Sequence, residues 1–169
     1  VHGQLAGGVT RLDADGAPDP AFKTEGGVIG DVACAAVQGD GRILIGGAFS
    51  RVRGMDQCAV ARLKADGTAD AGFRPSLTGP EGFEVAVIRL EPEGGIVLGG
   101  NFQRVAGVPR RGIARLPPDG SLDEGFDPGQ GVEDNFGHVL DVALGPDGRL
   151  LVAGYFTRFD GYDRPGLVA

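Results

Sequence analysis

Short apolar runs between polar turn residues make up the hydrophobic pattern of the chain. A continuous run of this length predicts a β-strand that is buried on both faces. No segment shows a 3.6-residue apolar period over three turns, so we expect no substantial helix. The runs lie at nearly constant spacing, at Ile43–Ile45, Ile96–Leu98 and Leu150–Val152.

A second strand is predicted just ahead of each run. These earlier strands span residues 32–37, 85–90 and 139–144. The two strands are separated by a turn such as Pro146-Asp147-Gly148, in which proline sets φ and glycine takes the left-handed position, so the chain reverses tightly. A third strand follows at residues 114–116 and at the equivalent positions. An Asp-Gly turn and a short fourth strand, which ends near a phenylalanine, complete the unit.

This unit occurs three times, at offsets of 51 and 53 residues, and the matches identify internal repeats. Residues present in every copy are needed by the repeat itself. We therefore interpret the arginine as the partner of a turn aspartate or carbonyl, and the phenylalanine as a plug between neighbouring sheets. The recurring positions are Arg11, Asp15, Asp19 and Phe22; Arg62, Asp66, Asp70 and Phe73; and Arg115, Asp119, Asp123 and Phe126.

The predicted fold is all-β, with β-propeller-like blades built from antiparallel four-stranded meanders of about 53 residues. Stacking similar sheets face to face covers both apolar faces of each one. A flat solenoid stack is the alternative. The predicted units are residues 1–29 (third and fourth strands of a preceding blade), 30–82 and 83–136 (complete blades), and 137–169 (the first three strands of a partial blade).

Three repeats are too few to close a propeller ring. We expect either a segment of a longer chain or association with another copy through the end blades. The sequence starts at Val1 and shows no signal peptide, which fits a processed or excised protein.

The composition changes this prediction little. The chain has 32 glycines and 11 prolines, and the glycines recur with the repeat, so they indicate turns rather than disorder. The formal charge is −7 and there is no basic tract, so nucleic acid is not an expected partner. No stretch approaches 18 consecutive apolar residues, so no membrane span is expected. Cys34 and Cys58 either form one disulfide or are two small apolar side chains in or near strands.

Two stretches of the third copy resemble the delta-60 repeat. One is Ile113–Leu116 with Asp119–Asp123 and Phe126, and the other is Val142–Leu144 with Pro146–Gly154. The resemblance covers nearly the whole chain. It implies a bacterial propeller domain of unknown function, found in tandem in large secreted or surface proteins.

The same resemblance implies an extracellular or cell-surface setting and a non-catalytic role in binding, adhesion or structural scaffolding. It implies no catalytic residues and no cofactor. The paired glycines Gly46-Gly47 and Gly99-Gly100 are also similar to those of kelch repeats, which have the same architecture.

The connection from the phenylalanine to the next first strand is the variable part of the repeat, at 10, 12 and 13 residues. Variable loops on one rim of a rigid scaffold are where binding usually occurs. We therefore expect a protein or glycan to bind there. The candidate binding residues are Glu81, Phe83, Glu84, Glu133, Asp134, Asn135 and His138.

An alternative function rests on the residue just before each first strand, which is Asp31, Glu84 or His138. Near a propeller axis these side chains would converge, and carboxylates with an imidazole can hold a metal ion for hydrolysis. The alternative function is therefore a metal-dependent propeller hydrolase. A solvated acidic rim is the simpler interpretation, and it is the one we favour. No nucleophile elbow, phosphate loop or Cys-His signature is present, so we do not expect an enzyme.

Overall fold

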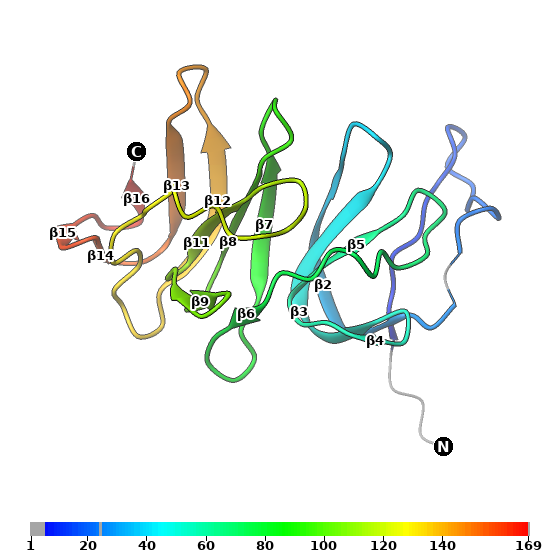
Figure 1. The fold of residues 1–169 in the computed structure, drawn as a ribbon, viewed down its shortest axis with the longest axis horizontal. Coiled ribbons are helices and arrows are strands. Elements are labelled where there is room, and N and C mark those ends of the chain that lie inside the picture. The colour runs from blue at the N-terminus through cyan, green and yellow to red at the C-terminus, as the bar shows by residue number, and fades with distance from the viewer. Residues whose placement is uncertain (1–5, 24, 169) are drawn as a thin grey trace.

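The computed structural model describes residues 6–23 and 25–168, and every regular element in them is a β-strand. The described residues contain no helix that could cross a membrane. Antiparallel sheets stand side by side in a row, with their hairpin turns along one edge (Figure 1). This arrangement confirms the predicted all-β fold with propeller-type blades.

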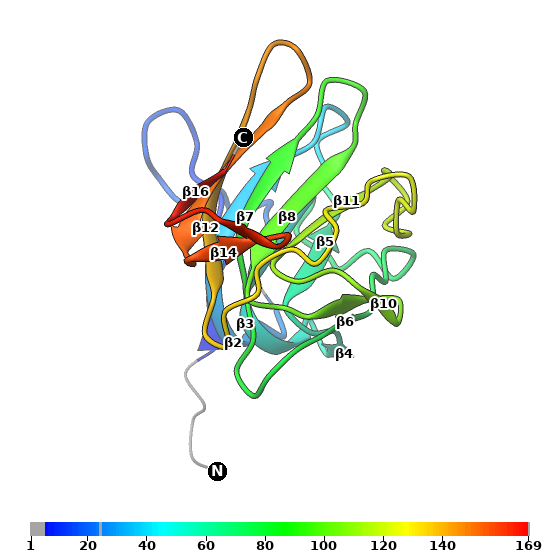
Figure 2. The ribbon, with the colours of Figure 1, turned by 90° about the vertical axis from the view of Figure 1, so that its left-hand side faces the viewer.

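We refer to each of the three main sheets as a blade, in which the second strand pairs with both the first and the third. Figure 2, turned by 90°, shows neighbouring blades stacked one behind another. Blade 1 contains β2 (Val28–Val37), β3 (Ile43–Val52) and β5 (Val60–Leu63); blade 2 contains β7 (Val85–Leu90), β8 (Ile96–Gly100) and β11 (Ile113–Leu116); blade 3 contains β12 (His138–Leu144), β13 (Leu150–Tyr155) and β16 (Leu167–Val168).

Short hairpins that the sequence analysis did not predict follow the second strands. Their turns are Arg53-Gly54, Ala106-Gly107 and Asp160-Gly161, and both residues of each turn have positive φ, between 47° and 81°. Two-residue turns of this kind match the twist of the flanking strands. The short strands are β1 (Ala6–Gly7), β4 (Met55–Asp56), β6 (Leu77–Thr78), β9 (Arg104–Val105), β10 (Val108–Pro109), β14 (Arg158–Phe159) and β15 (Tyr162–Asp163).

The fourth strand of the predicted meander is reduced to isolated bridges, Leu12 with Pro18 and Leu63 with Ala69. The aspartate that follows explains why. The Gly72 amide donates to the Asp70 side chain, and the Phe73 amide donates to the Asp70 carbonyl. The chain therefore turns after the bridge instead of extending into a strand.

The predicted unit 1–29 supplies a hairpin that packs on blade 1. Residues 9–22 make up this N-terminal hairpin, and Val9 and Phe22 contact the core of blade 1. Residues 1–5 and Thr24 of this unit lie outside the described residues.

Besides the core of blade 1, which packs against the N-terminal hairpin, two hydrophobic clusters lie between blades. One cluster joins Leu44 and Phe73 of blade 1 to Val85 of blade 2, and another joins blades 2 and 3. The second strands of blades 1 and 2 carry a glycine at the closest approach. A Cβ at Gly46 would lie 2.9 Å from Val85 Cγ1, and one at Gly99 would lie 2.7 Å from Val139 Cγ1. Glycine therefore lets neighbouring sheets approach each other closely.

The recurring arginine, aspartate and phenylalanine form a latch between blades. Arg62 Nε donates to Asp70 Oδ2 at 2.8 Å, and its guanidinium lies over the Phe73 ring, 4.5 Å from the centroid. Arg62 Nη1 also donates to the carbonyl of Pro118 in the next blade, and a Cβ at Gly120 would meet the Phe73 ring. The predicted pairing of the arginine with an aspartate and the phenylalanine plug between neighbouring sheets are confirmed for Arg62, Asp70 and Phe73.

Candidate functional site

The variable connections lie on the rim opposite the hairpin turns (Figure 1). In blade 1 the connection is shorter than predicted, because β2, the first strand, begins at Val28, four residues earlier than expected. In blades 2 and 3 it forms loops of residues 79–84 and 133–137. We call these segments rim loop 2 and rim loop 3.

Each first strand has a β-bulge close to its start. The bulge sets the position of the residue just ahead of the predicted strand. The register shifts between Val32 and Cys34, between Val85 and Val87, and between Val139 and Asp141. Beside each bulge stands a recurring glycine: a Cβ at Gly100, for example, would lie 2.1 Å from the Glu84 carbonyl. The bulge was not predicted, although the recurring glycine was its visible signal.

Rim loops 2 and 3 enclose a pocket of about 270 Å³ between blades 2 and 3. Three predicted binding residues line it: Glu81, Asp134 and Asn135. Phe136 also lines it and is 96% exposed. The sequence analysis missed Asn101, Gln103 and Arg111.

A signal for the missed residues does exist in the repeats. Asn101 aligns with Ala48 and Tyr155, directly after the recurring glycine, so this position varies in the same way as the rim loops. A comparison of the repeats at strand ends, as well as in loops, would have identified Asn101 as a variable position.

The two carboxylates of rim loop 3 hold the loop in place. The Thr157 hydroxyl and backbone amide donate to Asp134 at 2.7 and 2.6 Å, and these hydrogen bonds hold the pKa of Asp134 below its ordinary value. Glu133 accepts a hydrogen bond from the Gly161 amide. Asp134 thus ties the loop to Thr157, just beyond the end of β13, and Glu133 ties it to the turn between β14 and β15, which leaves Asn135 and Phe136 at the exposed tip.

Rim loop 2 is fixed in a similar way. The Glu84 amide donates to Asn101 Oδ1 at 2.7 Å. The Phe83 side chain packs closely on the backbone of Gly79. A Cβ atom added at Gly79 would lie 2.7 Å from the Cβ atom of Phe83. Phe83 is half-buried against the core between blades 1 and 2, so part of its role is structural.

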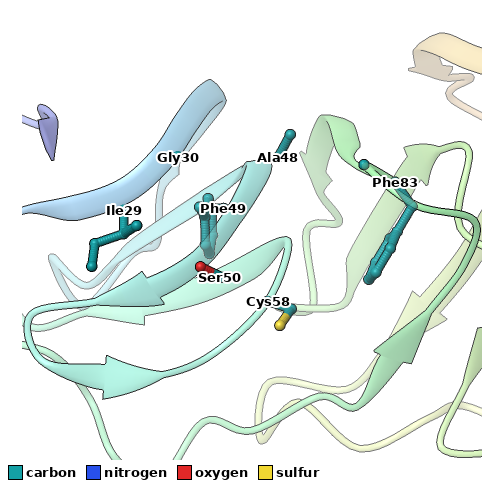
Figure 3. Close-up of a pocket in the computed structure, with 8 residues that line it drawn as sticks. Ile29, Gly30, Ala48, Phe49, Ser50, Cys58 and Phe83 are labelled. Carbon is teal, nitrogen blue, oxygen red and sulfur yellow. The ribbon is translucent and has the colours of Figure 1, made fainter. Parts of the chain in front are cut away.

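An equivalent pocket, of about 540 Å³, lies between blade 1 and rim loop 2. Figure 3 shows Phe83 on one side of it and Ala48, Phe49 and Ser50 of β3 on the other. Its lining is largely apolar, whereas the pocket between blades 2 and 3 presents a carboxylate, amides and a guanidinium. The same structural position therefore has different chemistry in different copies.

Two of the three residues of the alternative metal site lie together. His138 Nε2 is 3.3 Å from Glu84 Oε1, across the boundary between blades 2 and 3. Asp31 is exposed on blade 1. Residues 6–23 and 25–168 contain no group of three or more His, Cys, Asp or Glu side chains that could hold a metal ion.

The two cysteines are both free. Cys34 is half-buried, its thiol donates to the Val85 carbonyl at 3.7 Å, and burial raises its pKa to about 11. Cys58 is exposed beside the pocket of Figure 3. Of the two interpretations left open by the sequence, the structure supports separate side chains.

The comparisons with known proteins agree with the repeat structure. No curated protein matches the chain. A family of repeats described as "Domain of unknown function (DUF5122) beta-propeller" matches residues 38–73, 91–126 and 145–168. These segments begin in the hairpin turn of each blade, and together they make up more than half of the sequence. The chain therefore belongs to this β-propeller family of unknown function.

Proposed function

We propose that the chain is a non-catalytic binding module that holds a polar ligand on its rim, at the pocket between rim loops 2 and 3. One observation carries the proposal: this pocket combines side chains from two variable loops and a variable strand end with an exposed aromatic ring. Binding sites commonly sit on loops that a rigid scaffold positions.

The loops need little ordering when a ligand binds. Glu133 and Asp134 already attach rim loop 3 to β13 and its hairpin, and Asn101 holds rim loop 2. A preorganised site loses less conformational entropy on binding, so more of the contact energy contributes to affinity.

The chemistry of the pocket favours a short glycan segment. Arg111 donates hydrogen bonds, Glu81 accepts them and Asn135 does both. Sugar hydroxyls both donate and accept, so they match such a mixed set, while the apolar face of a sugar ring can pack on Phe136. A protein loop is the other class of ligand that the test below separates.

The resemblance to the delta-60 repeat supports an extracellular or cell-surface setting, in which such a module would serve adhesion or scaffolding. The alternative hydrolase would require a third ligand beside Glu84 and His138. In the described part of the chain, no third His, Cys, Asp or Glu side chain is grouped with these two.

Glycan and peptide arrays followed by calorimetry on the selected ligand test the proposal. Phe136→Ala should weaken binding at least tenfold. Tyr162→Ala is the matched control, since Tyr162 is also an exposed aromatic, on the nearby β14–β15 hairpin, but lies outside the pocket. Equal loss in both variants, selection of peptides alone, or no ligand on either array would contradict the proposed glycan site.

A further inference from the structure

Three positions of the repeat line both pockets between blades, and we call them the pocket positions. Two of them flank a phenylalanine near the end of the second strand, and the third lies two residues ahead of the third strand. They are Ala48, Ser50 and Cys58 in the pocket between blade 1 and rim loop 2, and Asn101, Gln103 and Arg111 in the pocket between rim loops 2 and 3. Equivalent residues therefore form one wall of each pocket, between two blades that the chain itself supplies.

The backbone around the pocket positions is the same in blades 1 and 2. The Ala59 amide donates to the Phe49 carbonyl at 3.0 Å, and the Gly112 amide donates to the Phe102 carbonyl at 2.9 Å. The side chains, by contrast, differ in every copy. The third copy has Tyr155, Thr157 and Pro165 at these positions. The blade therefore needs no particular side chain there, which leaves the pocket positions available to determine what a pocket binds.

Arg111 alone among the pocket positions carries a charge. Its backbone is fixed, because the Val132 amide donates to the Arg111 carbonyl at 3.1 Å. Within residues 6–23 and 25–168, however, its guanidinium has no hydrogen bond and no ion pair. The latch arginine Arg62 differs, since it is bonded to Asp70 and to a carbonyl of the next blade. Arg111 therefore presents to the pocket an exposed cation that the described chain does not use.

The carboxylates around the pocket do not neutralise this cation. Asp134 and Glu133 already accept the hydrogen bonds that hold rim loop 3, and Glu133 also lies 3.8 Å from Arg158 Nη1. Glu81, the third acid, forms no ion pair with any of the described residues. A guanidinium fork matches a carboxylate, to which it can donate two parallel hydrogen bonds. The pocket therefore suits a ligand that supplies a carboxylate itself.

We propose that the glycan bound in this pocket is acidic, with a uronic acid or a related sugar carboxylate that Arg111 binds. The inference rests on the proposed function and names the class of ligand for that site. Gln103 and Asn135 can both donate and accept hydrogen bonds, so they suit the hydroxyls beside the carboxylate. The pocket between blade 1 and rim loop 2 has Cys58 in place of Arg111, so it should make no such selection.

An array of uronic-acid oligosaccharides, each printed beside its carboxyl-reduced form, tests the proposal, and calorimetry on the best pair gives the affinities. The unmodified chain should bind the acidic form about tenfold more tightly, the gain expected of hydrogen bonds to a charged group. Arg111→Gln should bind both forms equally. Arg111→Lys, which keeps the charge but loses the fork, should keep part of the preference.

Arg104→Gln is the matched control. Arg104 is also an exposed arginine of blade 2, but it donates to the Gly107 carbonyl at 2.8 Å and lies outside the pocket, so this variant should keep the full preference. Equal binding of the two forms by the unmodified chain, or equal loss in both glutamine variants, would overturn the acidic ligand and leave the proposed glycan site standing. Tighter binding of an amino sugar would also overturn it, because Glu81 would then select the ligand. Failure to bind either form of any glycan would contradict the proposed function itself, and this inference with it.

Salt dependence gives a second readout that a purely structural role of Arg111 would not produce. Added sodium chloride should weaken binding of the acidic form and leave binding of the reduced form nearly unchanged, because ions screen exposed charges. Arg111→Gln should lose this weakening. A preference for the acidic form that did not change with salt would overturn the proposal, since the site would then recognise the shape of the ligand rather than its charge.

Discussion

The latch and the rim differ in how they vary along the chain. The latch uses the same three residue types in every repeat, with Arg62, Asp70 and Phe73 as the buried example. The rim changes in loop length and chemistry from one blade to the next, so that one pocket is largely apolar and its neighbour is polar. Repetition within a single chain therefore separates the residues that hold the scaffold from those available for a ligand.

The same comparison shows that identical residues at equivalent positions of two repeats can differ in burial. Arg62 and Arg115 make the same bonds within their own repeats, but of the two only Arg62 also donates to a carbonyl of the next repeat, that of Pro118. The second strands show the same contrast: β8 is buried throughout, whereas Leu151 and Tyr155 of β13 are exposed. Within residues 6–23 and 25–168, a neighbouring blade packs on both sides of blade 2 but on one side of blade 3.

The largest effect is expected for Phe73→Ala. Truncating a fully buried phenylalanine removes its packing and leaves a cavity, so the free energy of unfolding should fall by about 3–5 kcal/mol. Urea denaturation under dilute conditions measures it, with Phe126→Ala as the matched variant, whose loss should be smaller because that ring is half-buried. Equal losses would show that the two latches are equivalent.

The next effect concerns the charge of Asp70. Burial raises the pKa of this carboxyl, but hydrogen bonds from the Gly72 amide and the Arg62 guanidinium outweigh it and hold the pKa below its ordinary value. At pH 7, Asp70→Asn should cost about 2–4 kcal/mol, because Arg62 stays buried without its counter-charge. Asp123→Asn should cost less, since Arg115 is more exposed and has Glu91 3.8 Å away.

The pH dependence of that difference follows from its sign. A lowered folded-state pKa contributes stability above the ordinary value near 3.8, and this contribution is lost as the pH falls through the lower folded value. The gap between Asp70→Asn and the unmodified chain should therefore close below about pH 4. Urea midpoints measured from pH 7 downward would contradict this if the gap stayed constant.

The smallest effect on stability is expected at the rim. Phe136 is almost fully exposed, so Phe136→Ala should change the free energy of unfolding by no more than about 0.5 kcal/mol. Thermal unfolding checks this value. A loss well above 1 kcal/mol would mean that the ring packs on the scaffold, and the contrast between latch and rim would then fail at this residue.

Local features of the sequence were sufficient to predict much of the fold. The hairpin turns at 38–41, 91–94 and 145–148, the strands on either side and the recurring latch residues could all be located from turn chemistry and periodicity. These features depend on residues a few positions apart. The short hairpins were missed although their signal was also local, because no turn was assigned to their Gly54, Gly107 and Gly161.

Only the tertiary structure decided which residues share a site. Asn101 and Arg111 lie beside Asn135 because two blades stack, and no local pattern encodes that distance. Asp134, a predicted binding residue, lines the pocket and also accepts hydrogen bonds from Thr157, 23 residues away. The sequence alone was enough to identify three equivalent units; whether a given arginine is buried or open depends on a carbonyl up to 56 residues distant, and so on the packing of whole blades.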